Sequence, residues 1–344
     1  MAHTYTRLTP SKFLWLALAT ALTCIIVLSA LRDDRYLRFK SLTEPEVIKA
    51  GWIYERIHFD PTPIDVVFIG TSRTVAGIDS TIVEQTCRNA GGKYCSSVNF
   101  ALLNLGRNIH WLLTREVIQA RNPRLLVVEV QETEFRALHP LFPYLADPVD
   151  IVSAPLVINT SYLPDLGRLP ARQISLFAEN LALSLFGAEM KFVPSHYRGP
   201  HWDDTSKFQS NVVSVAELER ERTHLASVGA GKLRLPTPLR QFEYRANIFY
   251  LKKLLNLARE KNISICFLYI PTFNRTSTPV FANLYDKFGP TWQVSEEIAN
   301  RHELWRDVDH LNYDGAVALS KSVGLRIAQG YLAPDASMSV LTTR

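Results

Sequence analysis

The chain has 344 residues, of which 47% are hydrophobic and 21% are charged, and this composition is typical of a globular protein and not of a disordered one. Its formal net charge is +5, and the basic residues are scattered instead of alternating with aromatic residues along one element. The charge pattern therefore does not indicate a nucleic-acid-binding protein.

An uncharged apolar segment runs from Phe13 to Leu31 (FLWLALATALTCIIVLSAL). About 19 helical residues at ~1.5 Å each nearly match the ~30 Å hydrocarbon core of a bilayer. A cleaved signal peptide is the alternative, but its apolar region is usually shorter, and Arg32-Asp-Asp-Arg35 follows instead of a small-x-small cleavage site. We predict an N-terminal tail at residues 1–12 and a transmembrane anchor at residues 13–31. Basic residues flank the anchor on both sides, so charge alone does not settle its orientation.

After a juxtamembrane linker and helix at residues 32–62, apolar runs alternate with amphipathic segments. The apolar runs predict strands at 64–69, 94–100, 125–130 and 263–270, and the periodicity predicts helices at 44–58, 78–89, 108–121, 242–261 and 313–329. This alternation predicts an α/β domain at residues 63–332 with a mostly parallel sheet. Functional residues are then expected at the carboxyl ends of the strands.

The alternation is interrupted between about residues 132 and 239 by a stretch rich in proline, leucine and aromatic residues. We interpret this stretch as an insertion over the sheet, with one clear helix at about residues 171–192. Five large apolar side chains recur there at helical spacing: Ile174, Phe177, Leu181, Leu185 and Phe186. We expect them to pack on the sheet or cap the pocket, and the alternative is that they lie on a membrane or a partner. Residues 333–344 are predicted to be a flexible tail.

Two cysteines, Cys87 and Cys95, flank a Gly-Gly turn that could bring them within disulfide range. The alternative is two unpaired cysteines packed beside a helix end and a strand. A disulfide would indicate an oxidising compartment.

The strongest chemical signal is a serine that follows the first expected strand. The run Ile64–Ile69 leads into Gly70-Thr71-Ser72-Arg73, and far downstream the chain reads Asp307-Val-Asp-His310. A serine hydroxyl is a weak nucleophile until a base takes its proton, and an Asp-x-x-His loop supplies a base together with a group that orients it. We predict that Ser72 is the nucleophile, His310 the general base and Asp307 the residue that orients His310.

Acyl transfer also needs donors for the oxyanion of the tetrahedral intermediate. The candidates are the backbone N–H groups of Ser72 and Gly106 and the amide of Gln131 at the end of the third strand. Two further residues, Arg73 and Asn312, are candidates for binding the substrate. Arg73 either binds an anionic group of the substrate or pairs with an acidic residue, and we favour the pair.

Glu129 is a charged residue inside an apolar strand. It is either a neighbour of the active site or a partner of Arg73 or of a helix N-terminus. His196, His201 and Asp203 do not have the spacing of a strong metal site, and neither nucleotide-binding glycine motifs nor a His-Glu-x-x-His motif occurs. We expect neither a cofactor nor a metal.

Taken together, these residues resemble the SGNH/GDSL superfamily of serine esterases and acyltransferases. The block from Gly70 to Asp79 is similar to the Gly-Ser-Ser-Arg block of the membrane-anchored branch, and Leu268-Tyr-Ile-Pro271 is similar to that branch's penultimate strand. Asp307-x-x-His310-Leu-Asn-x-x-Gly315 is similar to the last block of the superfamily. The third block departs from the pattern, because Val130-Gln-Glu-Thr133 stands where Gly-x-Asn-Asp is expected.

The resemblance implies a three-layer α/β/α domain in which the insertion is lid-like. The membrane-anchored branch includes the alginate O-acetylation proteins and the D-alanyl transfer protein of lipoteichoic acid assembly. Both work beside a polytopic membrane-bound O-acyltransferase on the outer face of the bacterial cytoplasmic membrane. The resemblance therefore implies a single-pass inner-membrane protein of the cell envelope with a periplasmic catalytic domain.

Our first hypothesis is an O-acyltransferase that moves an acyl group, most simply acetyl, from an acyl donor to a hydroxyl of a cell-surface or secreted glycan. An esterase that removes such groups would use the same residues. The alternative from another class is a catalytically silent subunit of a membrane-bound O-acyltransferase or of a polysaccharide machinery. The altered third block favours this alternative, whereas retention of Ser72, Asp307 and His310 argues against it.

Overall fold

The computed structural model describes residues 9–31, 33–131, 138–157, 159–188, 190–202, 205–207, 212–230, 235–275, 279 and 281–331. Within them, one all-parallel sheet has the strand order β2-β1-β3-β4-β5. The strands are β1 (Val66–Ile69), β2 (Ser97–Asn99), β3 (Leu125–Val130), β4 (Ser264–Tyr269) and β5 (Thr291–Gln293). This sheet confirms the predicted α/β class. The strand order reverses at β1, and the carboxyl edge at such a reversal is the usual place for a ligand site.

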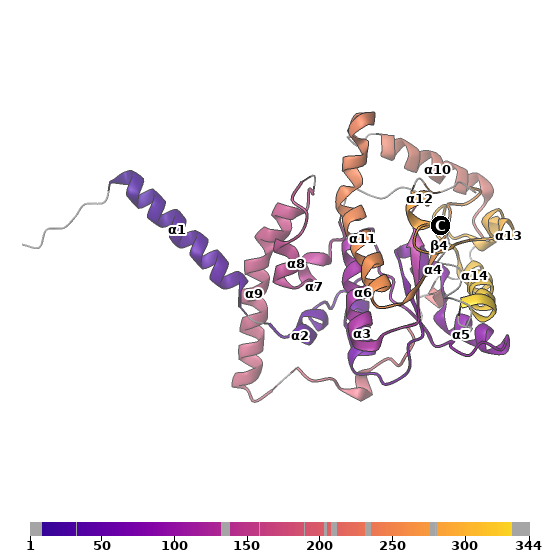
Figure 1. Cartoon of the computed structure of the whole chain (residues 1–344), viewed down its shortest axis with the longest axis horizontal. Helices are drawn as coiled ribbons and strands as arrows, with labels where there is room; N and C mark the ends of the chain where they lie inside the picture. Colours follow the sequence, from indigo (N-terminus) through magenta and orange to yellow (C-terminus); the bar gives the residue numbers. More distant parts are fainter. Residues whose placement is uncertain are drawn as a thin grey trace, which may run out of the picture.

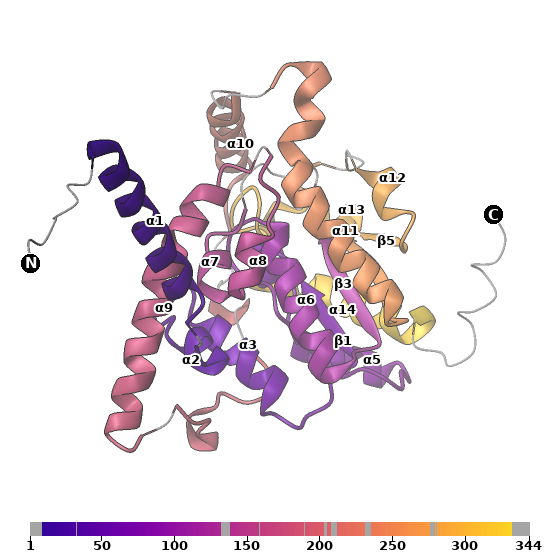
Figure 2. The same cartoon turned by 60° about the vertical axis from the view of Figure 1, so that its left-hand side comes forward.

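Side chains of each central strand alternate between two hydrophobic cores. Val67 and Ile69 of β1 belong to the first core, and Val66 and Phe68 belong to the second. The first core is closed by α3 (Lys49–His58), α6 (Arg107–Arg121) and α11 (Arg245–Glu260), the last two lying over β1 and β3 in Figure 2. The second is closed by α5 (Ser80–Asn89) and α14 (Tyr313–Arg326). Helices therefore cover both faces of the sheet.

The predicted helix at 78–89 is α5 in the structure, and a short helix that was not predicted, α4 (Ser72–Gly77), precedes it. The chain is extended at Ile78, with φ −123° and ψ 114°, and this conformation ends α4. Asp79 then caps α5, because its carboxylate accepts hydrogen bonds from the backbone N–H groups of Thr81 and Ile82. Ser72 consequently lies in the first turn of a short helix of its own.

The segment before the sheet contains α2 (Arg35–Lys40) and α3, and both contribute side chains to the first core. The sequence pattern missed α2, and it also missed β5, whose three residues are too few for a recognisable periodicity. The remaining short elements are α7 (Phe142–Leu145), α8 (Pro148–Val152), α12 (Ala282–Tyr285), α13 (Glu296–Ala299), the 3-10 turns Pro194–His196, Thr205–Lys207, Thr237–Tyr244 and His302–Leu304, and a π-helical turn at Ile327–Tyr331.

The predicted insertion contributes two long helices, α9 (Tyr162–Leu185) and α10 (Val215–Ala230). α9 starts earlier than predicted and continues through Pro170, although a proline usually interrupts a helix. The two helices lie in different places, α9 beside α1 and α10 above the other end of the sheet (Figure 1). Asp203 and the predicted tail at 333–344 lie outside the described residues.

The N-terminal helix α1 (Pro10–Ser29) is long and apolar enough to cross a membrane, and none of its residues is buried. It projects away from the sheet in Figure 1 and contacts α9. Its length and composition agree with the predicted anchor, although a signal sequence would have the same properties.

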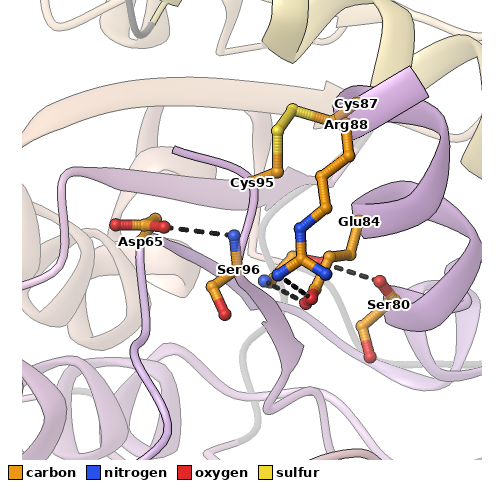
Figure 3. The surroundings of a disulfide bond; sticks show 8 residues. Asp65, Ser80, Glu84, Cys87, Arg88, Cys95 and Ser96 are labelled. Atoms are coloured by element: carbon orange, nitrogen blue, oxygen red, sulfur yellow. Dashed lines mark hydrogen bonds and ion pairs between the residues drawn. A yellow bond between two sulfur atoms is a disulfide. The ribbon is translucent and has the colours of Figure 1, made fainter. Parts of the chain in front are cut away.

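A disulfide joins Cys87 at the end of α5 to Cys95 before β2, with a Cα–Cα distance of 5.7 Å (Figure 3). Of the two alternatives left open by the sequence, the structure therefore has the disulfide and not two unpaired cysteines. The connecting turn needs glycine at position 92, because a Cβ atom there would lie 2.5 Å from the Cys87 sulfur and 2.7 Å from the Cys95 sulfur. The other two cysteines, Cys24 and Cys266, are free.

Candidate active site

Ser72 begins α4 immediately after β1, and only Gly70 and Thr71 separate it from the strand. A Cβ atom at position 70 would lie 2.1 Å from Thr74 Oγ1 and 2.6 Å from a carboxylate oxygen of Glu129, so the turn has no room for a side chain there. Thr71 caps α4, and Ser72 is partly exposed. The tight turn therefore presents the Ser72 hydroxyl at the carboxyl edge of the sheet.

The His310 ring lies between Ser72 and Asp307. Its Nε2 atom is 2.8 Å from Ser72 Oγ, and its Nδ1 atom is 2.8 Å from Asp307 Oδ1. With the proton on Nδ1, His310 donates to the Asp307 carboxylate and accepts the Ser72 hydroxyl proton in a hydrogen bond at Nε2. The structure thus brings together the three side chains that the sequence predicted, although Ser72 and His310 are 238 residues apart.

The loop that carries His310 holds Asp307 in place. Asp307 Oδ1 also accepts hydrogen bonds from the backbone N–H groups of Asp309 and His310, at 2.9 and 2.8 Å. Burial raises the pKa of Asp307, but the hydrogen bond and charge of His310 and the other donors outweigh burial and lower the pKa. Asp307 is therefore ionised at neutral pH, which is the state that stabilises an imidazolium.

Arg73 connects the nucleophile helix to the same loop. Its guanidinium is 2.6 Å from Asp309 Oδ1 and donates to the carbonyl of Ile270 at 3.0 Å. The sequence left two roles open for Arg73. In the structure it pairs with an acidic residue, Asp309, which is the role that we favoured. Arg73 therefore ties α4 to the Asp307–His310 loop and to the end of β4.

Glu129 lies beneath the Ser72 turn and is 2% exposed. Its carboxylate accepts hydrogen bonds from the backbone N–H and the hydroxyl of Thr71, both at 2.7 Å. It also accepts from the hydroxyl and the backbone N–H of Thr74, at 2.5 and 3.3 Å. The structure thus makes Glu129 an active-site neighbour that binds the N-terminus of α4, while Arg73 pairs with Asp309.

A second buried network, which the sequence did not reveal, lies at the start of α6. The fully buried Arg107 donates to the Glu129 carbonyl at 2.9 Å and lies 3.2 Å from His110 Nδ1 and from the Tyr285 hydroxyl. Burial, reinforced by the Arg107 charge, lowers the pKa of His110 well below its usual value. Burial also lowers the pKa of His139 to about 4. Both imidazoles are therefore neutral at pH 7, and that of His139 donates to the Leu103 carbonyl and accepts from the Leu141 N–H.

The three candidate oxyanion donors lie along one edge of the sheet. Gly106 ends the loop after β2 and has φ +145°, and a Cβ atom there would lie 2.2 Å from the His139 nitrogen. Gln131 follows β3 and is 4% exposed, and its Nε2 has no hydrogen-bond partner in the described part of the chain. Arg107, the residue after Gly106, donates to the Glu129 carbonyl, two residues before Gln131. Their role in binding an oxyanion stays a prediction.

Asn312 does not fit the substrate-binding role predicted for it. Its side chain is fully buried, accepts a hydrogen bond from the Gly315 N–H at 3.0 Å and donates to the Glu303 carbonyl at 2.7 Å. Asn312 is instead the N-cap of α14, a position in which asparagine is favoured because its side chain replaces a missing helical partner. The sequence could not distinguish the two roles, because a helix cap and a substrate-binding residue both appear as a polar residue before a helix.

A cleft of about 280 Å³ lies beside α4. Its apolar wall includes Val75, one helical turn after Ser72, and residues 101–103, whose Leu102 N–H bonds the Gly70 carbonyl at 3.2 Å. The other lining residues include Trp202 and two basic residues, Lys49 and Lys207. The cleft is assembled from segments far apart in the sequence, so no local pattern could predict it. Among the described residues, no group of three His, Cys, Asp or Glu side chains could hold a metal ion.

No protein-family model matches the chain, and no curated protein sequence matches it significantly. The site is therefore defined by the geometry of Ser72, His310 and Asp307 and by the short motifs that surround Ser72 and His310.

Proposed function

We propose that this protein is a membrane-anchored serine O-acyltransferase of the SGNH type, which transfers an acyl group, most simply acetyl, to a hydroxyl of a cell-surface or secreted glycan. The observation that carries the proposal is the continuous hydrogen-bonded line from Ser72 Oγ through His310 to Asp307. A nucleophile, a base and an orienting carboxylate in this geometry form the catalytic arrangement of serine acyl transfer.

In the first step, Ser72 Oγ attacks the carbonyl carbon of the acyl donor while His310 Nε2 takes the hydroxyl proton. Asp307 stabilises the resulting imidazolium, and the Ser72 and Gly106 N–H groups and the Gln131 amide are the candidates that bind the oxyanion. His310 then returns the proton to the leaving group, and the acyl group stays on Ser72 as an ester. In the second step, a glycan hydroxyl loses its proton to His310 and attacks this ester, and His310 returns the proton to Ser72 Oγ as the ester bond breaks.

The three-layer arrangement and the lid-like insertion expected from the resemblance belong to this proposal. The contact that supports a lid is made by α10 of the insertion, whose Glu221 accepts a hydrogen bond from the Val308 N–H at 3.0 Å, within the loop that carries Asp307 and His310. The cleft beside α4, which is lined by Val75 and not by Ser72 or His310, is the space that we propose for the distal part of the acyl donor or the acceptor. Exclusion of water from such a cleft would favour transfer to a glycan over hydrolysis.

We place the catalytic domain on the outer face of the bacterial cytoplasmic membrane, in the periplasm. The length and composition of α1 support a membrane anchor, and the disulfide between Cys87 and Cys95 supports an oxidising compartment. The proposed partner is a polytopic membrane-bound O-acyltransferase, which would deliver the acyl group across the membrane. No cofactor is required by the proposed mechanism.

The test is acyl-ester turnover by the full chain in detergent, with p-nitrophenyl acetate as donor and with or without an oligosaccharide acceptor. We expect release of p-nitrophenol and an acetyl group on Ser72 by mass spectrometry, both lost in Ser72→Ala. Ser175→Ala, which removes an exposed hydroxyl on α9, is the matched control and should behave as wild type. Acetylated oligosaccharide identifies a transferase. Turnover with water as the only acceptor would instead identify an esterase, and folded wild-type protein without turnover or acyl-Ser72 would identify a silent subunit.

A further inference from the structure

α9 lies between α1 and the catalytic domain. In Figures 1 and 2, it runs past the C-terminal end of α1, and the sheet lies on its other side. Gln173 of α9 is completely buried and donates a hydrogen bond to the Leu31 carbonyl, just after α1, at 2.6 Å. Arg172 donates to the carbonyls of Pro143 and Ala146 at 2.6 and 2.8 Å. α9 is thus fastened both to the domain and to the end of α1.

The outward face of α9 is apolar. Ile174, Phe177, Leu181 and Leu185 recur every three or four residues, so they form one stripe along the helix, and their exposures are 43%, 43%, 48% and 76%. Phe186, which follows the helix, is 87% exposed. Further exposed apolar side chains are Leu163 in the first turn of α9 and, on and after α8, which contacts α9, Val149, Val152, Leu156 and Val157.

Three polar side chains of α9 face the rest of the protein, together with Leu169 and Leu176, whereas the charged Arg168 and Glu179 are exposed. Asp165, Arg172 and Gln173 are among its buried residues, and Glu179 is the only charged residue between positions 173 and 186. A helix on the surface of a water-soluble protein usually turns its large apolar side chains inward, whereas α9 buries the charged Asp165 and Arg172 and exposes its apolar stripe. Large exposed apolar patches mark an interaction surface, and an outward apolar face is the arrangement that suits a lipid environment.

Continuity with α1 identifies the occupant of this surface. α1 exposes apolar side chains along its whole length, and the Gln173–Leu31 hydrogen bond places α9 where α1 ends. We propose that α9 is a membrane-surface helix whose stripe, formed by Ile174, Phe177, Leu181 and Leu185, is buried in the lipid of the bilayer that α1 spans. The inference rests on the anchoring role proposed above for α1. Its consequence is that two helices, and not one flexible tether, hold the catalytic domain at the membrane.

The test uses the full chain with an environment-sensitive NBD label, reconstituted in phosphatidylcholine–phosphatidylglycerol vesicles. Replacing Cys24 by alanine leaves three cysteines, of which two are bridged and one is buried, so a new cysteine can be labelled selectively. The label is placed at Leu181→Cys in the stripe or at Glu179→Cys, which is about 200° away around the helix. The native Cys24, in the C-terminal half of α1, is labelled in the unmodified chain as a reference for lipid contact.

We expect blue-shifted emission from the Leu181 label and at least twofold quenching by lipids with a doxyl group near the headgroup, whereas the Glu179 label stays water-like. Water-like emission at both positions, with quenching at Cys24, would overturn the inference alone and leave the stripe to a protein partner. Equal, strong quenching at both positions would place the whole helix inside the bilayer and would also overturn it. An unquenched Cys24 label would show that α1 does not span the membrane, and both the anchor and this inference would fail while the acyl-transfer chemistry stays untouched.

Discussion

The Glu129 carboxylate lies 2.7 Å from the backbone nitrogen of Thr71, the residue that immediately precedes the proposed nucleophile. Glu129 and Thr71 are 58 positions apart in the sequence, Glu129 on β3 and Thr71 just after the neighbouring strand β1. The carboxylate receives four hydrogen bonds from Thr71 and Thr74 at the turn that presents Ser72. The position of the serine hydroxyl therefore depends on a charged residue inside a strand.

Glu129→Gln should reduce kcat for p-nitrophenyl acetate by about 10- to 100-fold, because a displacement of about 1 Å at a nucleophile has effects of this size. The glutamine amide replaces one acceptor oxygen by a donor that faces other donors, so the free energy of unfolding should also fall by about 1–3 kcal/mol. Kinetics and denaturant unfolding measure the two effects. Glu260→Gln, an exposed change on α11, is the control, and equal kinetics in both variants would contradict a positioning role for Glu129.

Asp307→Asn should reduce kcat by about 10³- to 10⁴-fold, because the amide no longer stabilises the imidazolium or selects the right tautomer of His310. Asp309→Asn is the matched control, since Asp309 lies two residues away in the same loop but contacts Arg73. We expect it to lose less than about tenfold, as a partly exposed ion pair contributes little. Steady-state kinetics of both variants decide the matter. A larger loss in Asp309→Asn would reverse the assignment of the orienting carboxylate.

The free energy of unfolding should fall as the pH is lowered from about 6.5 toward 4. Burial lowers the pKa of His139 to about 4, below the value of 6.5 expected in the unfolded chain. The unfolded state therefore binds a proton in this window that the folded state excludes, and the stability that is present above pH 6.5 is progressively lost, by up to ~3 kcal/mol. His110, whose pKa burial also lowers, acts in the same direction.

Denaturant unfolding at pH 7 and at pH 4.5 measures this loss. His139→Gln should show a smaller decrease between the two pH values, even if the variant is less stable at both. The exposed His196→Gln is the control and should keep the decrease of the wild type. An unchanged decrease in His139→Gln would contradict the assignment to His139.

Removing the disulfide should lower the free energy of unfolding by about 2–3 kcal/mol, the chain-entropy cost of a loop as short as the one between Cys87 and Cys95. The double variant Cys87→Ala and Cys95→Ala, compared with wild type by denaturant unfolding, tests this. Cys266→Ala is not a suitable control because it would leave a cavity in the core. Cys24→Ala in α1 is suitable, and it should leave the unfolding of the domain unchanged. Two results together would show that the disulfide does not stabilise the fold. The wild type would be equally stable with and without reductant, and the double variant would be as stable as the wild type without reductant.

Some features of the fold could be predicted from the sequence because they depend on neighbouring residues. The apolar runs of β3 and β4 and the length of α1 are local patterns of hydrophobicity, and the strands lie within one residue of the predicted bounds. Ser72 and the Asp307–His310 pair could be singled out for a similar reason, since each sits in a short motif next to a regular element. The sequence predicted that Ser72, His310 and Asp307 meet, and in the structure hydrogen bonds join them.

Other features depend on residues that meet only after the chain has folded. The partner of Arg73 is 236 positions away, and nothing in the sequence near Glu129 or Arg107 indicates which groups surround them, because a buried charge takes its partners from whichever strands and helices pack against it. For the same reason, the capping role of Asn312 and the outward direction of the α9 stripe were not determined by the sequence. Helical periodicity shows that a face is apolar, but only tertiary packing decides whether that face is turned toward the core or away from it.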